Sequence, residues 1–467
     1  MSDLPLPQAF LEALGATVGV GHVATGAAVA LLDPGWNPHN LTAGIVVSPA
    51  NTQEVAAVVR LCAKFGVPLV PQAGRTGLVG GSVSRPGEIV LSLLRMNHVQ
   101  TIDPTERVAL VEAGCTLEAL QDAAAAVHLE PGIDLAARGS ATLGGMVSTN
   151  AGGVMAFRNG VMRHRVLGLE AVLPDGTVFQ DLTRVVKNSA GYDLKHLFIG
   201  AEGTLGVVTR LVVKLDPLPP ATATVLLGLP SIQATLDVIA RALQIDAGHL
   251  RAAEALWQDF MQLNAKALGW SDAAMPLNQP IYLLLKLGGL RHDGLQASLE
   301  KLFEETLERF PSSTGIIASS ERQEIDLWHL REDTDIVYRA HPQAPSYDVS
   351  VPLSKIPDYV TQVLAELTNL DPTLRPYIFG HLADGNLHII LNKTGPLGAE
   401  MAQAVERVLY RHLKFLGGSF SAEHGVGSKR ISAMNDTTDV AKLHTMRLVK
   451  NLLDPQAIMN PGKLFQT

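Results

Sequence analysis

Cysteine is nearly absent from this chain of 467 residues, which contains only Cys62 and Cys115. Two thiols exclude a disulfide framework, and they are too few for an iron–sulfur cluster, which usually takes four thiolates. We therefore expect both cysteines to be small buried hydrophobic residues.

Long apolar runs and an early positive charge are also missing. No stretch reaches the roughly 18 consecutive apolar residues that span a bilayer, and the first Lys or Arg is Arg60, which does not fit a secretory signal. We expect a cytoplasmic protein without a membrane span. A net charge of -8 with scattered signs argues against nucleic acid or an anionic membrane as the main partner.

Glycine, in contrast, is abundant, with 42 residues, and the length fits two or three domains. Strands, turns and glycine loops dominate residues 1–217, the expected first domain. A proline cluster then precedes a region of long amphipathic helices and short apolar strands, residues 218–417. Residues 418–467 return to glycine-rich loops, and we expect this C-terminal segment to pack back on the first domain.

The first domain is predicted to open with a β-α-β unit. A β-branched strand at 44–48 is followed by Asn51 and Glu54, which have N-cap and N3 spacing for a helix that runs to Phe65. Gly66 ends this helix, and residues 67–70 return as a strand. One alanine-rich helix is expected later in the domain, at 116–127.

The second domain shows helical patterns at 294–310 and 356–367 between apolar strands at 282–287 and 315–318. This alternation is typical of an α+β domain with helices on one face of a sheet.

Four glycine clusters lie in the first domain. The first, PQAGRTGLVGG at 71–81, directly follows a predicted strand, and its backbone N–H groups suit a pyrophosphate. It is not the Rossmann fingerprint, because residues 88–93 read as a strand rather than a helix. The others are GSATLGG at 139–145, TNAGG at 149–153 and GAEGTLGVVT at 200–209. Each alone could be a glycine-rich turn, but together they suggest a long polar ligand against bare backbone.

A histidine-containing hairpin is predicted in GHLADGNLH, residues 380–388. If Asp384 and Gly385 form a two-residue turn, His381 lies directly opposite His388, and the two imidazoles can bind one divalent ion. A pair of solvated or packed histidines is the alternative.

The segment SAEHGVGSKR, residues 421–430, offers a carboxylate at Glu423 and a titratable imidazole at His424. Neighbouring side chains of a regular strand point to opposite faces, so both reach one site only if Gly425 and Gly427 bend the chain. An exposed charged loop is the alternative.

The four glycine clusters, together with KNSAGYDLKHLFIG at 187–200, resemble the FAD-binding domain of the vanillyl-alcohol oxidase type. The resemblance implies an α+β flavoprotein in which an antiparallel-sheet cap domain binds substrate. It implies noncovalent FAD, because the first loop has no histidine to tether the flavin. The implied cofactor-binding residues are Pro71, Ala73, Gly74, Arg75, Thr76, Gly77, Leu78, Gly80, Gly81, Gly139, Ser140, Thr142, Gly144, Gly145, Asn150, Gly153, Glu202, Gly206, Val207 and, from the C-terminal NPGK, Asn460.

The hairpin and the SAEHGVGSKR segment resemble the D-2-hydroxyacid dehydrogenase branch of this flavin family, from about Thr42 to Phe465. The branch includes D-2-hydroxyglutarate and D-lactate dehydrogenases. The resemblance implies a metal held by His381, His388 and Glu423, with zinc the usual ion and manganese or iron as alternatives. It implies that His424 accepts the substrate proton.

The segment Trp328–Glu332 matches the family's helical segment with a substrate arginine, so Arg331 is the expected carboxylate clamp, with a helical ion pair as the alternative. The other expected substrate contacts depart from the hydroxyglutarate enzymes, since Asp335, Ser346 and Ile390 stand where those place threonine, lysine and asparagine. His381 and His388 would reach substrate through the metal. One clamp suits one carboxylate, which favours D-lactate or a longer monocarboxylic acid over D-2-hydroxyglutarate.

The expected activity is oxidation of a D-2-hydroxy acid to the 2-oxo acid, with hydride transfer to flavin N5. Without iron–sulfur ligands, the electrons must pass to a separate acceptor, and the resemblance suggests electron-transferring flavoprotein or a quinone. A related oxidase that produces hydrogen peroxide and a noncatalytic flavin electron-transfer subunit are the alternatives. The sequence leaves open whether the chain forms a homodimer.

Overall fold

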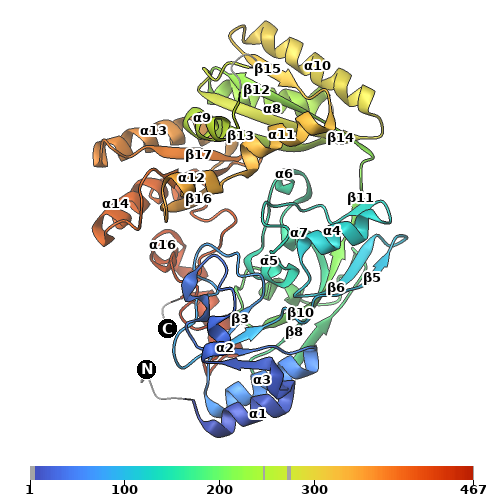
Figure 1. The fold of residues 1–467 in the computed structure, drawn as a ribbon, viewed down its shortest axis with the longest axis vertical. Helices are drawn as coiled ribbons and strands as arrows, with labels where there is room; N and C mark the ends of the chain where they lie inside the picture. The colour runs from blue at the N-terminus through green and yellow to red at the C-terminus, as the bar shows by residue number, and fades with distance from the viewer. Residues whose placement is uncertain (1–5, 246–247, 271–274, 466–467) are drawn as a thin grey trace. The chain divides into compact units, whose positions relative to one another are not determined.

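A computed structural model describes residues 6–245, 248–270 and 275–465 (Figure 1). The chain forms two compact units. The first, called the flavin unit after the cofactor that its glycine clusters are expected to bind, contains residues 1–153, 159–218 and 423–467. The second, called the sheet unit, contains residues 154–158 and 219–422. No helix among the described residues is long and apolar enough to cross a membrane.

The flavin unit contains the expected β-α-β unit, but the unit does not open the domain, because two helices and a strand within residues 8–30 precede it. Helix α3 (Thr52–Phe65) starts where the side chain of Asn51 accepts the N–H of Glu54, and it ends at Gly66 in the left-handed conformation. The strands β2 (Ile45–Val47) and β3 (Leu69–Gln72) both run parallel to β4 (Ile89–Ser92), which lies between them. This confirms the helix and the strand after the first glycine loop.

Helix α1 (Gln8–Val18) packs against α3 (Figure 1). The ring centroids of Phe10 and Phe65 are 5.3 Å apart. Cys62 and Cys115 are both free and buried, and burial raises the pKa of the Cys62 thiol to about 12. The prediction that both cysteines are buried hydrophobic residues is confirmed.

A second, five-stranded antiparallel sheet completes the core of the flavin unit, in the order β5-β6-β10-β8-β9. Its strands are β5 (Val99–Asp103), β6 (Val108–Glu112), β8 (Val166–Val172), β9 (Val178–Asp181) and β10 (Val207–Lys214). The main helices of this unit are α4 (Leu117–Ala125), α5 (Leu143–Thr149) and, in the C-terminal segment, α16 (Ile431–Thr437) and α17 (Val440–Leu453). Shorter elements elsewhere in the chain are β1 (Val23–Thr25), α2 (Ala27–Ala30), β7 (Leu129–Glu130), α6 (Ala156–Asn159), α7 (Met162–Arg165), β11 (Asp216–Pro217) and α15 (Leu413–Leu416).

The sheet unit is built on one seven-stranded antiparallel sheet in the order β15-β12-β14-β13-β17-β18-β16. Its strands are β12 (Ala221–Leu229), β13 (Leu250–Trp257), β14 (Ile281–Gly289), β15 (Thr314–Ile317), β16 (Ser346–Ser350), β17 (Pro376–His381) and β18 (Asn386–Leu391). Its helices are α8 (Ile232–Ile245), α9 (Gln258–Ala267), α10 (His292–Arg309), α11 (Glu321–Glu332), α12 (Asp335–Ala340), α13 (Ile356–Leu370) and α14 (Ala399–Tyr410).

Helices cover both faces of this sheet, so the expectation of a single covered face was wrong. Leu256, Phe379 and Ile390 share an apolar cluster with residues of α9, α11 and α12. On the opposite face, a β-carbon on Gly315 would lie 2.9 Å from the ring of Phe303 in α10. The strands are apolar on both sides, and burying both faces requires helices on both.

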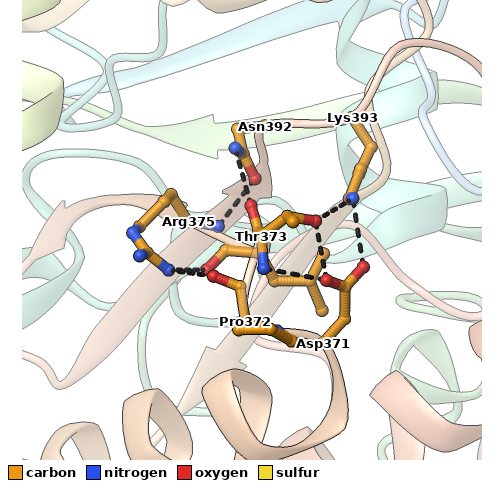
Figure 2. Close-up of polar contacts among 7 residues, drawn as sticks. Asp371, Pro372, Thr373, Arg375, Asn392 and Lys393 are labelled. Atoms are coloured by element: carbon orange, nitrogen blue, oxygen red, sulfur yellow. Dashed lines mark hydrogen bonds and ion pairs between the residues drawn. The ribbon is translucent and has the colours of Figure 1, made fainter.

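The outer end of the β17–β18 hairpin is held by a polar cluster (Figure 2). The Arg375 N–H donates to Asn392 Oδ1 over 2.6 Å, and Lys393 Nζ donates to Asp371 Oδ2 over 3.1 Å. The Asp371 carboxylate also accepts the Thr373 hydroxyl over 2.6 Å. These bonds hold the ends of both strands together, and the strand register decides which side chains share a face.

Candidate functional site

The glycine clusters of the flavin unit pack backbone against backbone. A β-carbon on Gly74 would lie 2.0 Å from the carbonyl oxygen of Ser140, and one on Gly153 would lie 2.0 Å from that of Asp134. No other residue fits at such distances. Some of the glycines in these clusters are therefore needed because the loops pack closely against neighbouring backbone, and not because a ligand contacts them. Gly77 differs, because a β-carbon there would have no heavy atom within 4 Å and would face open space.

Two polar atoms of the predicted cofactor residues are buried without a hydrogen-bond partner among the described residues. These are Thr142 Oγ1, just before α5, and Asn460 Oδ1. The amide nitrogen of Asn460 is occupied, since it donates to the carbonyls of Gly81 and Glu202. A buried unpaired acceptor costs about 1–3 kcal/mol, so both atoms fit loops that receive a polar ligand.

Glu202, a predicted cofactor residue, instead holds the segment after His424. Its carboxylate accepts the N–H groups of Val426 over 2.7 Å and Gly427 over 2.8 Å. Burial raises the pKa of this carboxyl, and the two backbone bonds oppose that rise. Glu202 therefore joins the fourth glycine cluster to the C-terminal segment.

The chain bends after His424, as the sequence requires if Glu423 and His424 are to serve one site. Gly425 and Gly427 have φ values of 81° and 54°, which confirms the bend. Glu423 Oε1 accepts the N–H of Gly153 over 2.5 Å. The expected carboxylate ligand thus lies against the glycine cluster that is expected at the flavin ring.

Some predicted cofactor residues have their side chains engaged elsewhere. Arg75 donates to Gln72 Oε1 over 2.8 Å and to the Asp33 carbonyl over 2.7 Å, and burial lowers the pKa of its guanidinium. Asn150 Oδ1 accepts the Arg163 N–H, and Val207 is a core residue. Arg75 and Asn150 would therefore meet a cofactor mainly through their backbone.

The register of the histidine hairpin differs from the prediction. Phe379, and not His381, pairs with His388, and residues 382–385 form a four-residue connection. A two-residue type I′ turn needs positive φ at both central residues, but only Gly385 has it, at 80°. The shift is two residues, an even number, so His381 and His388 still project from the same face.

That face of the sheet, called the histidine face, carries a line of polar residues. Glu254 pairs with His381, His388 pairs with Asp348, and Ser346 pairs with Ile390 across neighbouring strands. Directly opposite residues of antiparallel strands share a face. Four strands therefore bring two histidines and two carboxylates together.

The two histidine rings lie close enough to hold one ion between them. Their ring centroids are 5.4 Å apart at an interplanar angle of 85°, and both side chains are buried. Ligand nitrogens of the two rings lie within 4.8 Å of each other. His381 Nδ1 is 2.7 Å from Glu254 Oε1, which makes Nε2 the ligand nitrogen expected of His381.

Glu254 is fully buried and was not predicted. Its second oxygen, Oε2, is 2.8 Å from Nε of Arg331, which is buried on α11. The Arg331 guanidinium lies over the Phe379 ring, 4.8 Å from its centroid. A single acidic residue inside the apolar strand sequence LRAAEALW was the signal that could have identified Glu254.

Asp348, also fully buried, is the second carboxylate that sequence reasoning missed. It lies opposite His388, and its Oδ2 accepts the N–H of Ala422 over 2.9 Å. Ala422 directly precedes Glu423 in the chain. Asp348 therefore anchors, within the sheet unit, the residue next to the expected third ligand.

Of the remaining predicted substrate residues, two lie on the histidine face and one lies on the surface. Ser346 lies opposite Ile390 on the histidine face and hydrogen-bonds to Tyr338, whose pKa is raised by burial despite that bond. Asp335 is exposed at the start of α12. The structure thus brings Ser346 and Ile390 to the histidine face and leaves Asp335 on the surface.

Comparison with known proteins finds two family matches. Residues 43–181 match the family described as FAD binding domain, and residues 218–464 match FAD linked oxidases, C-terminal domain.

Relatives cover most of the chain. A D-2-hydroxyglutarate dehydrogenase from Xanthomonas citri pv. viticola is 37% identical, over 92% of this chain and 90% of the relative. The mitochondrial D-2-hydroxyglutarate dehydrogenase of Bos taurus is 36% identical, over 91% and 77%. A putative mitochondrial D-lactate dehydrogenase of Schizosaccharomyces pombe is 34% identical, over 90% and 81%.

Solved structures share the fold at low identity. A p-cresol methylhydroxylase with substrate bound matches with a TM-score of 0.76 at 16% identity, over 98% of this chain and 97% of that one. A 4-ethylphenol oxidase from Gulosibacter chungangensis matches with a TM-score of 0.72 at 18% identity, over 98% and 96%.

Proposed function

We propose that this chain, which belongs to the family of FAD-linked D-2-hydroxyglutarate and D-lactate dehydrogenases, oxidises a D-2-hydroxy acid to the 2-oxo acid. One observation carries the proposal beyond the family. Glu254 contacts both His381 on the histidine face and Arg331 on α11, which supports a metal ligand and an acid-binding cation in one site. This arrangement suits a substrate with a hydroxyl next to a carboxylate.

FAD would be held by the glycine clusters of the flavin unit. The open space at Gly77 and the unpaired acceptors Thr142 Oγ1 and Asn460 Oδ1 support this assignment. Bound FAD supplies the acceptor for the hydride of the oxidised carbon. The first loop, residues 71–81, contains no histidine, so we propose that acid precipitation releases the flavin from the protein.

A divalent metal would be held by His381, His388 and Glu423. Two imidazoles and one carboxylate suit zinc, and manganese or iron are the alternatives. The hydrogen bond from His381 Nδ1 to a carboxylate is the usual support for a metal-binding histidine. The bound ion supplies a Lewis acid that lowers the pKa of the substrate hydroxyl.

The other residues orient the acid and move its proton. Arg331 uses Nε on Glu254, so its two terminal nitrogens remain to bind the substrate carboxylate as a fork. His424 lies between Glu423 and the bend at Gly425, and it would accept the proton of the substrate hydroxyl.

We propose that a monocarboxylic acid, D-lactate or a longer homologue, is preferred over D-2-hydroxyglutarate. Lys286 pairs with Glu324 at 2.8 Å, and Arg339 pairs with Asp333 at 2.5 Å. Each of these cations already pairs with a carboxylate of the protein, so neither is assigned to the second carboxylate of a dicarboxylic substrate. Ile390 adds an apolar surface beside Ser346, which favours an alkyl tail.

Anaerobic flavin reduction tests this function directly. Purified protein is mixed with D-lactate, D-2-hydroxybutyrate, D-2-hydroxyglutarate and the L-enantiomers, and the loss of flavin absorbance is followed. We expect bleaching by the D-acids, with the highest catalytic efficiency on a monocarboxylic acid in steady-state assays with an artificial acceptor. No bleaching by any acid would contradict the proposed reaction, whereas a preference for hydroxyglutarate would contradict only the assigned specificity.

The electrons would leave to a separate acceptor, for which we propose electron-transferring flavoprotein or a quinone, in the cytoplasm. A hydrogen peroxide assay in air distinguishes this dehydrogenase from an oxidase. A noncatalytic electron-transfer subunit is disfavoured, because an electron carrier does not need the buried histidine and arginine of the histidine face.

A further inference from the structure

Glu254 is a single buried carboxylate shared by two groups with different tasks. Its Oε1 lies 2.7 Å from Nδ1 of His381, and its Oε2 lies 2.8 Å from Nε of Arg331. The side chain of Glu254 has no exposed surface, and those of His381 and Arg331 are each 8% exposed. Water therefore cannot substitute for either contact without entering the core.

Each contact restricts its partner in a definite way. In the tautomer in which Nδ1 of His381 donates to the Glu254 carboxylate, Nε2 keeps its lone pair. The same carboxylate fixes the Nε edge of Arg331, while the Phe379 ring lies 4.8 Å from the guanidinium carbon. The guanidinium is thus held between a carboxylate and an aromatic ring.

We propose that Glu254 is a positioning residue that couples the metal site to the acid-binding site. By fixing Nε2 of His381 and the fork of Arg331 with one carboxylate, it sets the distance between the metal-bound hydroxyl end and the carboxylate end of the substrate. This inference rests on the proposed function, because both partners acquire their tasks there.

Two substitutions of Glu254 separate the two contacts. E254A removes both, so the zinc affinity falls by about 10- to 100-fold, as for other lost supports of a ligand histidine, and the KM for the acid rises. E254Q keeps one acceptor. Metal binding requires an unprotonated Nε2 on His381, so Nδ1 carries the proton and the amide oxygen of E254Q accepts it. The amide NH₂ then faces the N–H of Arg331, and two donors cannot hydrogen-bond to each other. Zinc affinity then stays close to wild type, while the KM rises by about tenfold, the cost of one lost ion-pair contact.

E170Q is the matched control. Glu170 is another buried carboxylate that pairs with an arginine, Arg210, but it lies in the five-stranded sheet of the flavin unit. Its substitution lowers the melting temperature and leaves zinc affinity and KM unchanged. A merely structural Glu254 would give the same pattern as Glu170.

The measurements are zinc affinity by competition with a chromophoric chelator, KM and kcat at saturating zinc, and the melting temperature of each FAD-loaded variant. Wild-type zinc affinity in E254A, or an unchanged KM in E254Q, overturns the coupling. If E254A does not fold, the KM of E254Q tests the contact with Arg331. The zinc affinity of E254D, whose shorter side chain withdraws the carboxylate, then tests the contact with His381. Full turnover of wild-type protein after chelation would instead overturn the proposed metal centre, and the KM of E254Q would still test the Arg331 contact.

Discussion

The two units present their chemistry in opposite ways. Apart from the side chains of Glu423 and His424, the flavin unit offers backbone, in loops where Gly74 and Gly153 leave no space for a side chain. The sheet unit offers side chains, placed on the histidine face by the two-residue period of its strands. A site made of backbone depends on glycines, which have no side chain, whereas a site made of side chains depends on strand register and on partners such as Glu254.

This difference predicts different consequences of substitution. Adding one carbon at a closely packed glycine such as Gly74 should destabilise the flavin unit, while the sheet unit should lose its function when one buried polar group is removed. Four experiments test the contrast.

His381→Ala should have the largest effect. Removal of the imidazole eliminates one of the three proposed ligands, so metal and turnover are both lost, while FAD stays bound because the flavin unit holds it. The measurements are metal content by mass spectrometry, flavin absorbance and steady-state activity.

The control is His412→Ala, since His412 lies beside Gln362 and Glu366, outside the histidine face. This variant should retain metal and activity. Unchanged metal content in His381→Ala would remove the hairpin from the metal site, and simultaneous loss of FAD would mean that the metal is structural.

His424→Ala should slow anaerobic flavin reduction by about 10²- to 10⁴-fold, the usual contribution of a positioned base. The metal should remain, because its ligands are intact. Stopped-flow absorbance measures the rate, and metal analysis accompanies it. Flavin reduction at the wild-type rate would exclude His424 as the proton acceptor.

Gly74→Ala and Gly77→Ala compare packing with ligand binding inside one loop. The new β-carbon of Gly74→Ala collides with the Ser140 carbonyl, so the free energy of unfolding should fall by about 1–3 kcal/mol. Gly77→Ala meets no protein atom within 4 Å. Its apoprotein should therefore keep its stability while its affinity for FAD falls.

Urea unfolding of the apoproteins and flavin titration measure these two effects. Gly21→Ala, also without a neighbour within 4 Å, should change neither quantity. If Gly77→Ala binds FAD as tightly as wild type, the open space at Gly77 is not part of the cofactor site.

Asp371→Asn should have the smallest effect and a defined pH dependence. Hydrogen bonds from Thr373 and then Lys393 lower the pKa of Asp371 from its usual value to about 2. Because the folded-state pKa is depressed, the carboxylate stabilises the protein above its unfolded pKa of about 3.9, and this contribution is lost as the pH falls toward 2.

The melting temperature of Asp371→Asn should therefore lie slightly below that of wild type at pH 6, and the difference should shrink below about pH 4. A difference in melting temperature that stays constant from pH 6 to pH 3 would show that the polar cluster in Figure 2 stabilises the protein without the charge of Asp371.

The sequence by itself determined the features that depend on local chemistry. The cap at Asn51, the stop at Gly66 and the bend at Gly425 and Gly427 follow from side chains and backbone within a few residues. The family and its flavin were also visible in the sequence, because a backbone site is marked by its glycines.

Only the tertiary structure decided the register of the hairpin and the partners of its residues. The turn at 382–385 is held by the Val351 N–H, which donates to the Gly385 carbonyl from another strand end, so no local rule could give its length. Likewise, Glu254 is 127 residues from His381 and meets it only through the pairing of β13 with β17. Such contacts are set by the pairing of strands that are far apart in the chain, and this pairing cannot be derived from the local residue pattern of a single sequence.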